Sequence, residues 1–113
     1  MLTLPTKGKW FYMLLSGEKP EEYREIKPYY TVRFSRIFNM VDGIPLDKAV
    51  NQIRFTNGYG NSVPSFIADC HLERHTGRAE WGAEENIEYY VLHLHKIRWK
   101  SMDGKGGYWS RTA

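Results

Sequence analysis

Two segments place hydrophobic residues at every second position, the spacing of β-strands that bury one face, and the composition and closing turn of a third segment also predict a strand. The clearest segment covers residues 88–99, where one face would carry Tyr90, Leu92 and Leu94. Another follows Pro64, and its apolar face would hold Phe66, Ala68, Cys70 and Leu72. The third covers residues 50–55 and ends at the turn sequence Asn-Gly-Tyr-Gly. These three segments predict β-strands.

The amino-terminal part of the chain mixes helix and strand patterns. Leu2 and Leu4 predict a short opening strand that ends at Pro5. An apolar stripe over residues 6–16 predicts a helix that Thr6 caps and Gly17 stops. Residues 22–26 alternate and predict a strand. Residues 29–38 fit a helix and a strand equally well, and Asp-Gly and Ile-Pro steps predict a turn over 41–46.

These elements predict an α+β fold, specifically a small, mainly antiparallel β-barrel with one or two short flanking helices. The chain has 113 residues, enough for one core and too few for two. We expect the barrel domain over residues 1–100. Residues 101–113, which include Gly-Lys-Gly-Gly, are expected to form a flexible or loosely packed tail.

Composition narrows the class of protein. Hydrophobic residues make up 42% of the chain, and no stretch approaches the roughly 20 apolar residues of a membrane-spanning helix. The single cysteine, Cys70, excludes an intrachain disulfide, and its place on an apolar strand face predicts an unreactive core residue. We therefore expect a cytoplasmic protein that does not interact with membranes.

Charge and aromatic content bear on the kind of ligand. The net charge is +3, divided as +3 over residues 1–41, −4 over 42–95 and +4 over 96–113. The basic ends could form a cationic patch for phosphate groups, although so small an excess is also ordinary for a solvated surface. Aromatic residues reach 15%, more rings than a small core is expected to bury. Some of them are expected on the surface as recognition groups.

The densest group of charged side chains lies over residues 17–24, Gly-Glu-Lys-Pro-Glu-Glu-Tyr-Arg. If Glu22 and Arg24 point to the same side of a strand, they can form an ion pair beside Lys19. Lys19 would then be free to bind a phosphate or carbonyl group of a ligand. The alternative is a solvated run of charges on an exposed loop.

The spacing Gly17-x-Lys19-x-x-Glu22-x-Arg24, behind an apolar helix with Trp10, resembles the G-x-K-x-x-E-x-R signature of the ASCH domain. That family belongs to the PUA-like superfamily of small β-barrels. The later stretches at 57–60, Pro64 and 80–84 (Glu-Trp-Gly-Ala-Glu) are similar to a small single-domain branch found in phage and bacterial genomes. The resemblance covers roughly residues 2–99.

The resemblance implies a cleft between the barrel and the first helix that takes RNA, nucleotides or modified nucleosides. Some ASCH relatives cleave RNA, and a short branch removes the acyl group of an N4-acylated cytidine with a lysine, a threonine and a glutamate. Lys19 matches that lysine, whereas Glu22 stands where that branch has its threonine. Glu80 and Glu84 are both candidates for the later glutamate. Without the threonine, a hydrolase would need a glutamate such as Glu22 as the general base that activates water.

Three functions remain open. As a binding module, the cleft would bind RNA, a nucleotide or a modified nucleoside through charged, polar and aromatic side chains, namely Lys19, Glu22, Arg24, Tyr23, Asn57, Tyr59 and Trp81. As an enzyme, a ribonuclease or nucleoside amidohydrolase would use Lys19 with a glutamate. A protein-partner interaction module would instead show a continuous apolar patch.

We expect no cofactor and no metal site. His93 and His95 alternate on a strand and could share a face, as zinc ligands can. His71 and His75 would lie about 13 Å apart if that segment is a strand. No Cys-x-x-Cys pair accompanies them. Histidines on a half-exposed strand face are more often solvated side chains than metal ligands.

Overall fold

The computed structural model describes residues 1–60, 62–102 and 108–109. Its elements, in chain order, are β1 (Leu2–Thr6), α1 (Gly8–Ser16), β2 (Glu21–Glu25), α2 (Pro28–Ser35), β3 (Met40–Val41), β4 (Ile44–Pro45), β5 (Asn51–Asn57), β6 (Ser65–Thr76), the 3-10 turn η1 (Ala79–Trp81), β7 (Glu88–Ser101) and β8 (Tyr108–Trp109).

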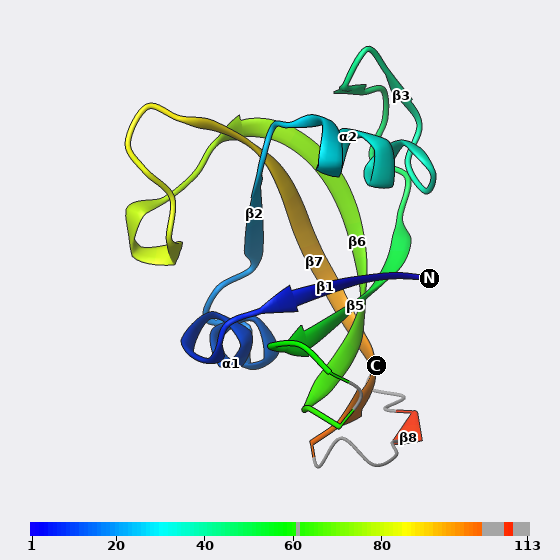
Figure 1. The fold of residues 1–113 in the computed structure, drawn as a ribbon, viewed down its shortest axis with the longest axis vertical. Coiled ribbons are helices and arrows are strands. Elements are labelled where there is room, and N and C mark those ends of the chain that lie inside the picture. The colour runs from blue at the N-terminus through cyan, green and yellow to red at the C-terminus, as the bar shows by residue number, and fades with distance from the viewer. Residues whose placement is uncertain (61, 103–107, 110–113) are drawn as a thin grey trace.

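The main sheet has the strand order β1-β5-β6-β7-β2, and β8 pairs with the end of β7. Only the β1–β5 pair is parallel. β6 and β7 are long and strongly curved, and their connection extends away from the sheet (Figure 1). β1 and β2 form the two edges, and the described residues show no pairing between them. The structure therefore confirms a mainly antiparallel α+β fold, with an open sheet in place of a closed barrel.

The core lies on the concave side of this sheet. The predicted apolar faces of β6 and β7 are buried, with Phe66, Cys70 and Tyr90 fully inaccessible to solvent. Phe11 of α1 packs on Phe66 with ring centroids 5.2 Å apart, and Phe55 of β5 packs on the same ring at 5.1 Å. Phe66 therefore connects the first helix to the sheet.

The helices differ in detail from the sequence predictions. The undecided segment 29–38 contains helix α2, with Pro28 in its first turn. β1 continues past Pro5 to Thr6, because an edge strand tolerates a residue without an N–H group. Thr6 consequently does not cap α1, whose N-cap is Lys7 without a side-chain hydrogen bond. Gly17 ends α1 in the left-handed conformation, as predicted. Neither described helix is long and apolar enough to span a membrane.

The turn predicted over residues 41–46 is the two-residue connection of the β3–β4 hairpin, where Asp42 and Gly43 both have positive φ. At the carboxyl end, β7 runs to Ser101, and Trp99 pairs with Trp109 of β8. These two parts of the expected tail belong to the sheet. The rest of that tail, residues 103–107 and 110–113, lies outside the described residues.

The buried Cys70 thiol is expected to resist chemical modification in the folded protein. Burial raises the pKa of this thiol well above its ordinary value, and the neighbouring Asp69 carboxylate raises it further. Because the thiolate is the reactive form, iodoacetamide should label Cys70 only after urea unfolds the chain. Mass spectrometry of native and unfolded samples measures this. Labelling of the native protein at the rate of a free thiol would contradict the packing described here.

Candidate functional site

Three residues of the signature meet at the point where β2 follows α1. Lys19 Nζ lies 2.7 Å from Glu22 Oε1, and Arg24 Nη2 lies 2.9 Å from Glu22 Oε2. Lys19 is 2% exposed and Glu22 5% exposed. The chain places them there because Gly17 turns it out of α1, and because alternate residues of β2 point to the same side. The result is a buried cation–carboxylate–cation network.

The same network joins the two edges of the sheet. Arg24 Nη2 on β2 donates to the Pro5 carbonyl (2.9 Å) and to Thr6 Oγ1 (3.1 Å) on β1. The Thr6 hydroxyl lies 3.3 Å from Glu22 Oε2. These side-chain contacts connect strands that share no backbone pairing. Sequence reasoning missed Thr6 as a site residue, since it assigned the hydroxyl to a helix cap.

Lys19 is not free to receive a ligand, contrary to the prediction. Its ammonium group is bound to Glu22 and lies 4.7 Å from the centroid of the Trp10 ring and 5.6 Å from that of Tyr23. Glu22 accepts hydrogen bonds from both cations and from the Tyr23 backbone N–H. The network is therefore the preorganised floor of a site, and a ligand would contact it from above.

Two pKa shifts describe the charge state of this region. Burial alone would lower the pKa of Arg24, but the Glu22 carboxylate and the Tyr30 hydroxyl raise it above its ordinary value. Arg24 therefore stays cationic. Burial raises the pKa of Tyr23, and its hydrogen bond to Glu21 adds to the effect. Tyr23 stays a neutral phenol that donates to Glu21 Oε2 at 2.6 Å.

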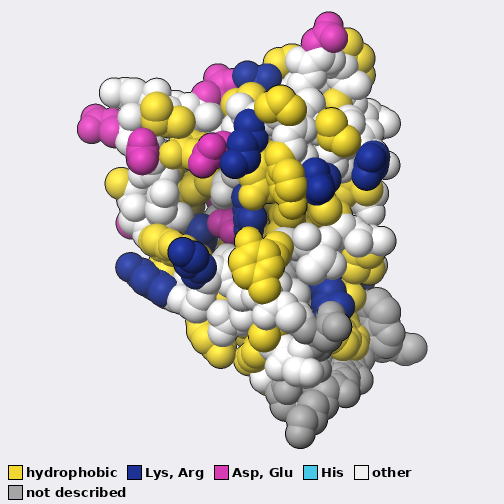
Figure 2. Space-filling model, viewed as in Figure 1, with side chains coloured by type: hydrophobic (Ala, Val, Ile, Leu, Met, Phe, Trp, Pro, Cys, Tyr) yellow, Lys and Arg dark blue, Asp and Glu magenta, His cyan; other side chains and the backbone are white. Residues whose placement is uncertain are grey.

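A cleft of about 810 Å³ opens above the network. Its walls come from the β1–α1 junction, from β2 with the start of α2, and from the connection between β6 and β7. Aromatic side chains are prominent on these walls, namely Trp10, Tyr23, Tyr30, Trp81 and Tyr89. Figure 2 shows a hollow on this face, with basic and hydrophobic side chains gathered around it and acidic atoms within it.

The remaining predicted site residues divide between the cleft and its surroundings. Trp81 and Glu84 line the cleft. Glu80 does not line it, because its carboxylate faces the solvent and pairs with Arg78 at 2.6 Å. Asn57 and Tyr59 are also absent from its lining. The structure therefore favours Glu84 over Glu80 as the later glutamate of the site.

Tyr59 lies beside the cleft instead. It is 86% exposed and lines a neighbouring depression of about 550 Å³ together with Tyr29 and Arg33 of α2. Arg24 and Tyr30 line both hollows, so the two adjoin. An exposed ring at this place can contact a part of a ligand that extends from the cleft.

Two cleft cations were missed by sequence reasoning. Lys7 and Lys27 are exposed and line the rim. Lys27 Nζ lies 3.7 Å from Glu25 and 5.5 Å from the centroid of the Tyr30 ring, so its ammonium group has only weak partners among the described residues. Neither lysine belongs to the Gly-x-Lys-x-x-Glu-x-Arg spacing, and the only earlier signal was the basic excess of residues 1–41. With Lys19 and Arg24 paired to Glu22, these rim lysines are the cations most available to a phosphate group.

The cleft also contains a carboxylate without a partner. Glu84 is exposed, and among the described residues its side chain has neither a hydrogen bond nor an ion pair. Its backbone N–H donates a hydrogen bond to the Tyr89 hydroxyl at 3.0 Å, and this contact holds the residue in place. Such a group is able to accept a proton or a hydrogen bond from a ligand.

The four histidines of the chain gather outside the cleft, on the other face of β6 and β7. The spacing within one strand does not show the strand pairing, which aligns His71 of β6 with His93 of β7. Two groups of three side chains there have the separations that metal ligands need.

Comparison of the chain with protein-family models, with curated proteins and with solved structures finds no match. The ASCH resemblance therefore remains a hypothesis carried by the sequence motif, and the function is argued from the site itself.

Proposed function

We propose that this protein binds a nucleotide, a modified nucleoside or an unpaired base of RNA in the cleft above Lys19, Glu22 and Arg24. The observation that carries the proposal is the combination of aromatic walls with a buried, hydrogen-bonded ionic floor. Aromatic rings stack on bases, and fixed charged groups bind the polar edges of a base.

The size and charge of the cleft favour a single nucleotide unit. A volume of about 810 Å³ lies within the range of small-ligand pockets, about 300–1,000 Å³. The lining holds four basic side chains (Lys7, Lys19, Arg24, Lys27) and four carboxylates (Glu22, Glu25, Glu84, Glu88). This balance lacks the large positive excess that binds a phosphate backbone along its length. RNA would therefore enter as one unstacked residue.

Under this proposal, each part of the ligand would contact different side chains of the cleft. Trp81 and Tyr23 both line the cleft, and one stacked base contributes about 1–3 kcal/mol. A phosphate would lie at the rim, near Lys7 and Lys27. Bases or sugars that extend further would reach Tyr59 in the adjoining depression.

We further propose that the fold is an ASCH-type, PUA-like variant whose barrel is closed by side chains. The contacts from Arg24 to Pro5 and Thr6, across the two sheet edges, support this interpretation. We also propose a cytoplasmic location, because the one cysteine is a buried free thiol and the fold does not rely on an oxidising compartment.

The binding proposal predicts separate effects of two substitutions. Trp81→Ala should lower the affinity for nucleosides and for nucleotides alike by roughly 5- to 150-fold, because it removes one stacking face. Lys7→Ala should lower the affinity for nucleotides and leave the affinity for nucleosides unchanged, because it removes a phosphate contact. Isothermal titration calorimetry with a panel of nucleosides, their monophosphates and short single-stranded RNA measures both.

Lys48→Ala is the matched control, since Lys48 is an exposed lysine outside the cleft lining. Affinity should be the same as for the unaltered protein. If Trp81→Ala and Lys48→Ala bind every compound equally well, the ligand does not lie in this cleft. If no compound of the panel binds, the nucleotide proposal fails and the alternative of a protein-partner module gains support.

Hydrolysis is the second candidate function, and the position of Glu84 favours it. A carboxylate without a partner, in the same cleft as a lysine, an arginine and the Thr6 hydroxyl, can act as a general base toward water or a ribose 2′-hydroxyl. Mass analysis of the same titration mixtures, with N-acylated nucleosides included, would detect products. If the unaltered protein gives products, Glu84→Gln should abolish this turnover and Glu80→Gln should leave it intact. That result would identify the protein as a hydrolase.

A further inference from the structure

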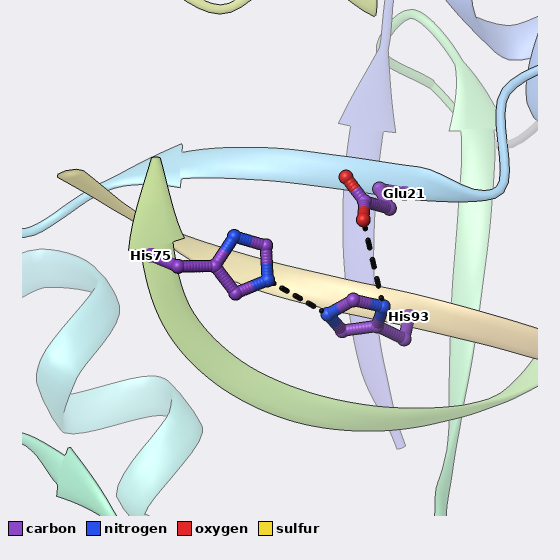
Figure 3. Close-up of side chains that lie close together, drawn as sticks. All are labelled: Glu21, His75 and His93. Carbon is purple, nitrogen blue, oxygen red and sulfur yellow. Dashed lines mark hydrogen bonds and ion pairs between the residues drawn. The ribbon is translucent and has the colours of Figure 1, made fainter. Parts of the chain in front are cut away.

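All four histidines of the chain lie together, on the face of β6 and β7 opposite the core residues Cys70, Leu72 and Leu92. His71 and His75 come from β6, and His93 and His95 from β7. The rings of His71 and His93 stack with centroids 4.6 Å apart, and the ring of His75 lies 5.2 Å from that of His93. His93 is therefore the centre of the cluster. Figure 3 shows His75 and Glu21 on two sides of it.

Ligand atoms of three side chains converge beside the His93 ring. Glu73 Oε2 lies 2.6 Å from His71 Nε2 and 3.2 Å from His93 Nε2. His75 Nε2 approaches His93 Nε2 from another side, at 3.0 Å. These atoms come from two adjacent strands whose pairing sets His71 opposite His93. The arrangement is thus held by the sheet rather than by a flexible loop.

The far nitrogens of the two central rings have their own partners. His71 Nδ1 lies 2.6 Å from His95 Nε2. His93 Nδ1 faces Glu21 Oε1 at 3.7 Å, and the Tyr23 hydroxyl donates to the other oxygen of Glu21. Metal-binding histidines usually donate their second ring N–H to such an outer group, which fixes the tautomer and the ring orientation. Here His71 has an outer group within hydrogen-bond distance, and Glu21 lies slightly beyond that distance from His93.

We propose that His71, Glu73 and His93 bind a divalent transition-metal ion, Zn²⁺ by preference, with a water molecule in the remaining position. Imidazole and carboxylate are ligands that Zn²⁺ accepts in tetrahedral sites. From Zn–N and Zn–O bonds of about 2.1 Å, two ligand atoms of a tetrahedral site lie about 3.4 Å apart. The separation of 3.2 Å between His93 Nε2 and Glu73 Oε2 is close to that value.

Metal binding requires a rearrangement of protons, an opening of the cluster, and a rotation of the His71 and His93 rings, which are now nearly parallel at 3°, so that both Nε2 lone pairs point to one centre. His71 Nε2 and Glu73 Oε2, now 2.6 Å apart, would separate by roughly 0.8 Å to reach the tetrahedral spacing. The proton of His71 would lie on Nδ1 and be donated to His95. The proton of His93 would lie on Nδ1, and Glu21 would move closer than its present 3.7 Å to accept it. Both Nε2 atoms would then be available to the metal.

The site would act as a clamp on the fold. It joins β6 and β7 directly and reaches β2 through Glu21. Tyr23, which lines the cleft, is hydrogen-bonded to that same Glu21. A bound metal would therefore hold an edge strand and one cleft wall in position. The proposal does not depend on what the cleft binds.

The test is a titration of Zn²⁺ into the full chain, purified without a histidine tag and stripped with a chelator. Isothermal titration calorimetry should show one saturable site per chain, and thermal unfolding should shift to higher temperature with Zn²⁺. Co²⁺ should give the intense visible absorption of four-coordinate geometry. His93→Ala and Glu73→Gln should each weaken Zn²⁺ binding by more than about 100-fold, beyond the range of outer-group substitutions.

Glu21→Gln should weaken binding by about 10- to 100-fold, as expected of an outer group. Glu85→Gln, on an exposed residue outside the cluster, is the matched control and should leave the affinity unchanged. Circular dichroism verifies that each variant folds, and Glu73→Gln, which keeps the size of a half-exposed side chain, provides the test if His93→Ala does not fold. Absence of a saturable Zn²⁺ site in the unaltered protein overturns the proposal. So does tight binding that survives both His93→Ala and Glu73→Gln.

Discussion

Replacing Glu22 with glutamine is expected to lower the free energy of unfolding by about 3–5 kcal/mol. The carboxylate is 5% exposed and is the shared partner of Lys19 and Arg24. A neutral amide leaves two buried cations without a counter-charge, and their desolvation is then uncompensated. Its NH₂ group would also face one of the two cationic donors.

Urea unfolding, followed by circular dichroism and tryptophan fluorescence, measures this loss. The control is Glu25→Gln on the same strand, where the carboxylate is exposed and its ion pair with Lys27 spans 3.7 Å. Such a pair contributes about 0–1 kcal/mol, so the control should change stability little. Equal effects of the two substitutions would show that Glu22 is not the buried partner of both cations.

The cost of losing Glu22 does not show that the network exists for stability. Apolar residues of similar volume often replace a buried ion pair without loss, because desolvating the charges offsets most of their attraction. A chain that needed only a closed seam between β1 and β2 could use them. Three charged side chains at the floor of a cleft would instead serve the polar ligand that we propose.

Phe66→Ala is expected to destabilise the protein by a similar amount, about 3–5 kcal/mol. The ring is fully buried between Phe11 of α1 and Phe55 of β5. Truncation removes the apolar contact area and leaves a cavity that the curved sheet cannot close completely. It also loosens α1, whose first residues border the cleft.

Chemical denaturation again gives the magnitude, with Phe66→Leu as the graded comparison. Leucine restores part of the volume, so its effect should be clearly smaller than that of alanine. Val32→Ala on the exposed face of α2 serves as the surface control and should change stability little. A cost for Phe66→Ala no larger than that of Val32→Ala would mean that this ring does not connect helix and sheet.

The strands were predictable where one face is buried and the other is not. β6 and β7 show this in their alternating residues, and Gly17 marks the end of α1 because a left-handed stop is cheapest at glycine. The segment of α2 was ambiguous because Tyr30 and Phe34 fit both periods. The segment forms a helix because Phe34 packs against Tyr90 and Phe38 in the core.

The sequence predicted which residues of the 17–24 segment belong to the candidate site, but not which contacts each of them makes. Spacing along β2 puts Glu22 and Arg24 on one side, since alternate residues of a strand share a face. Local sequence cannot show that Lys19 is covered by Trp10, or that Thr6 faces Glu22 from another strand. Those contacts depend on how the sheet curves, which brings together residues sixteen positions apart.

By itself, the amino-acid sequence determined the local elements of this protein, because backbone periodicity and turn chemistry depend on near neighbours. It also determined which charged residues would meet on β2. Only the tertiary structure decided that the sheet stays open, that Glu84 and two rim lysines border the cleft, and that four histidines from two strands share one centre. The physical reason is that strand register and curvature follow from the packing of the whole core, which no single segment encodes.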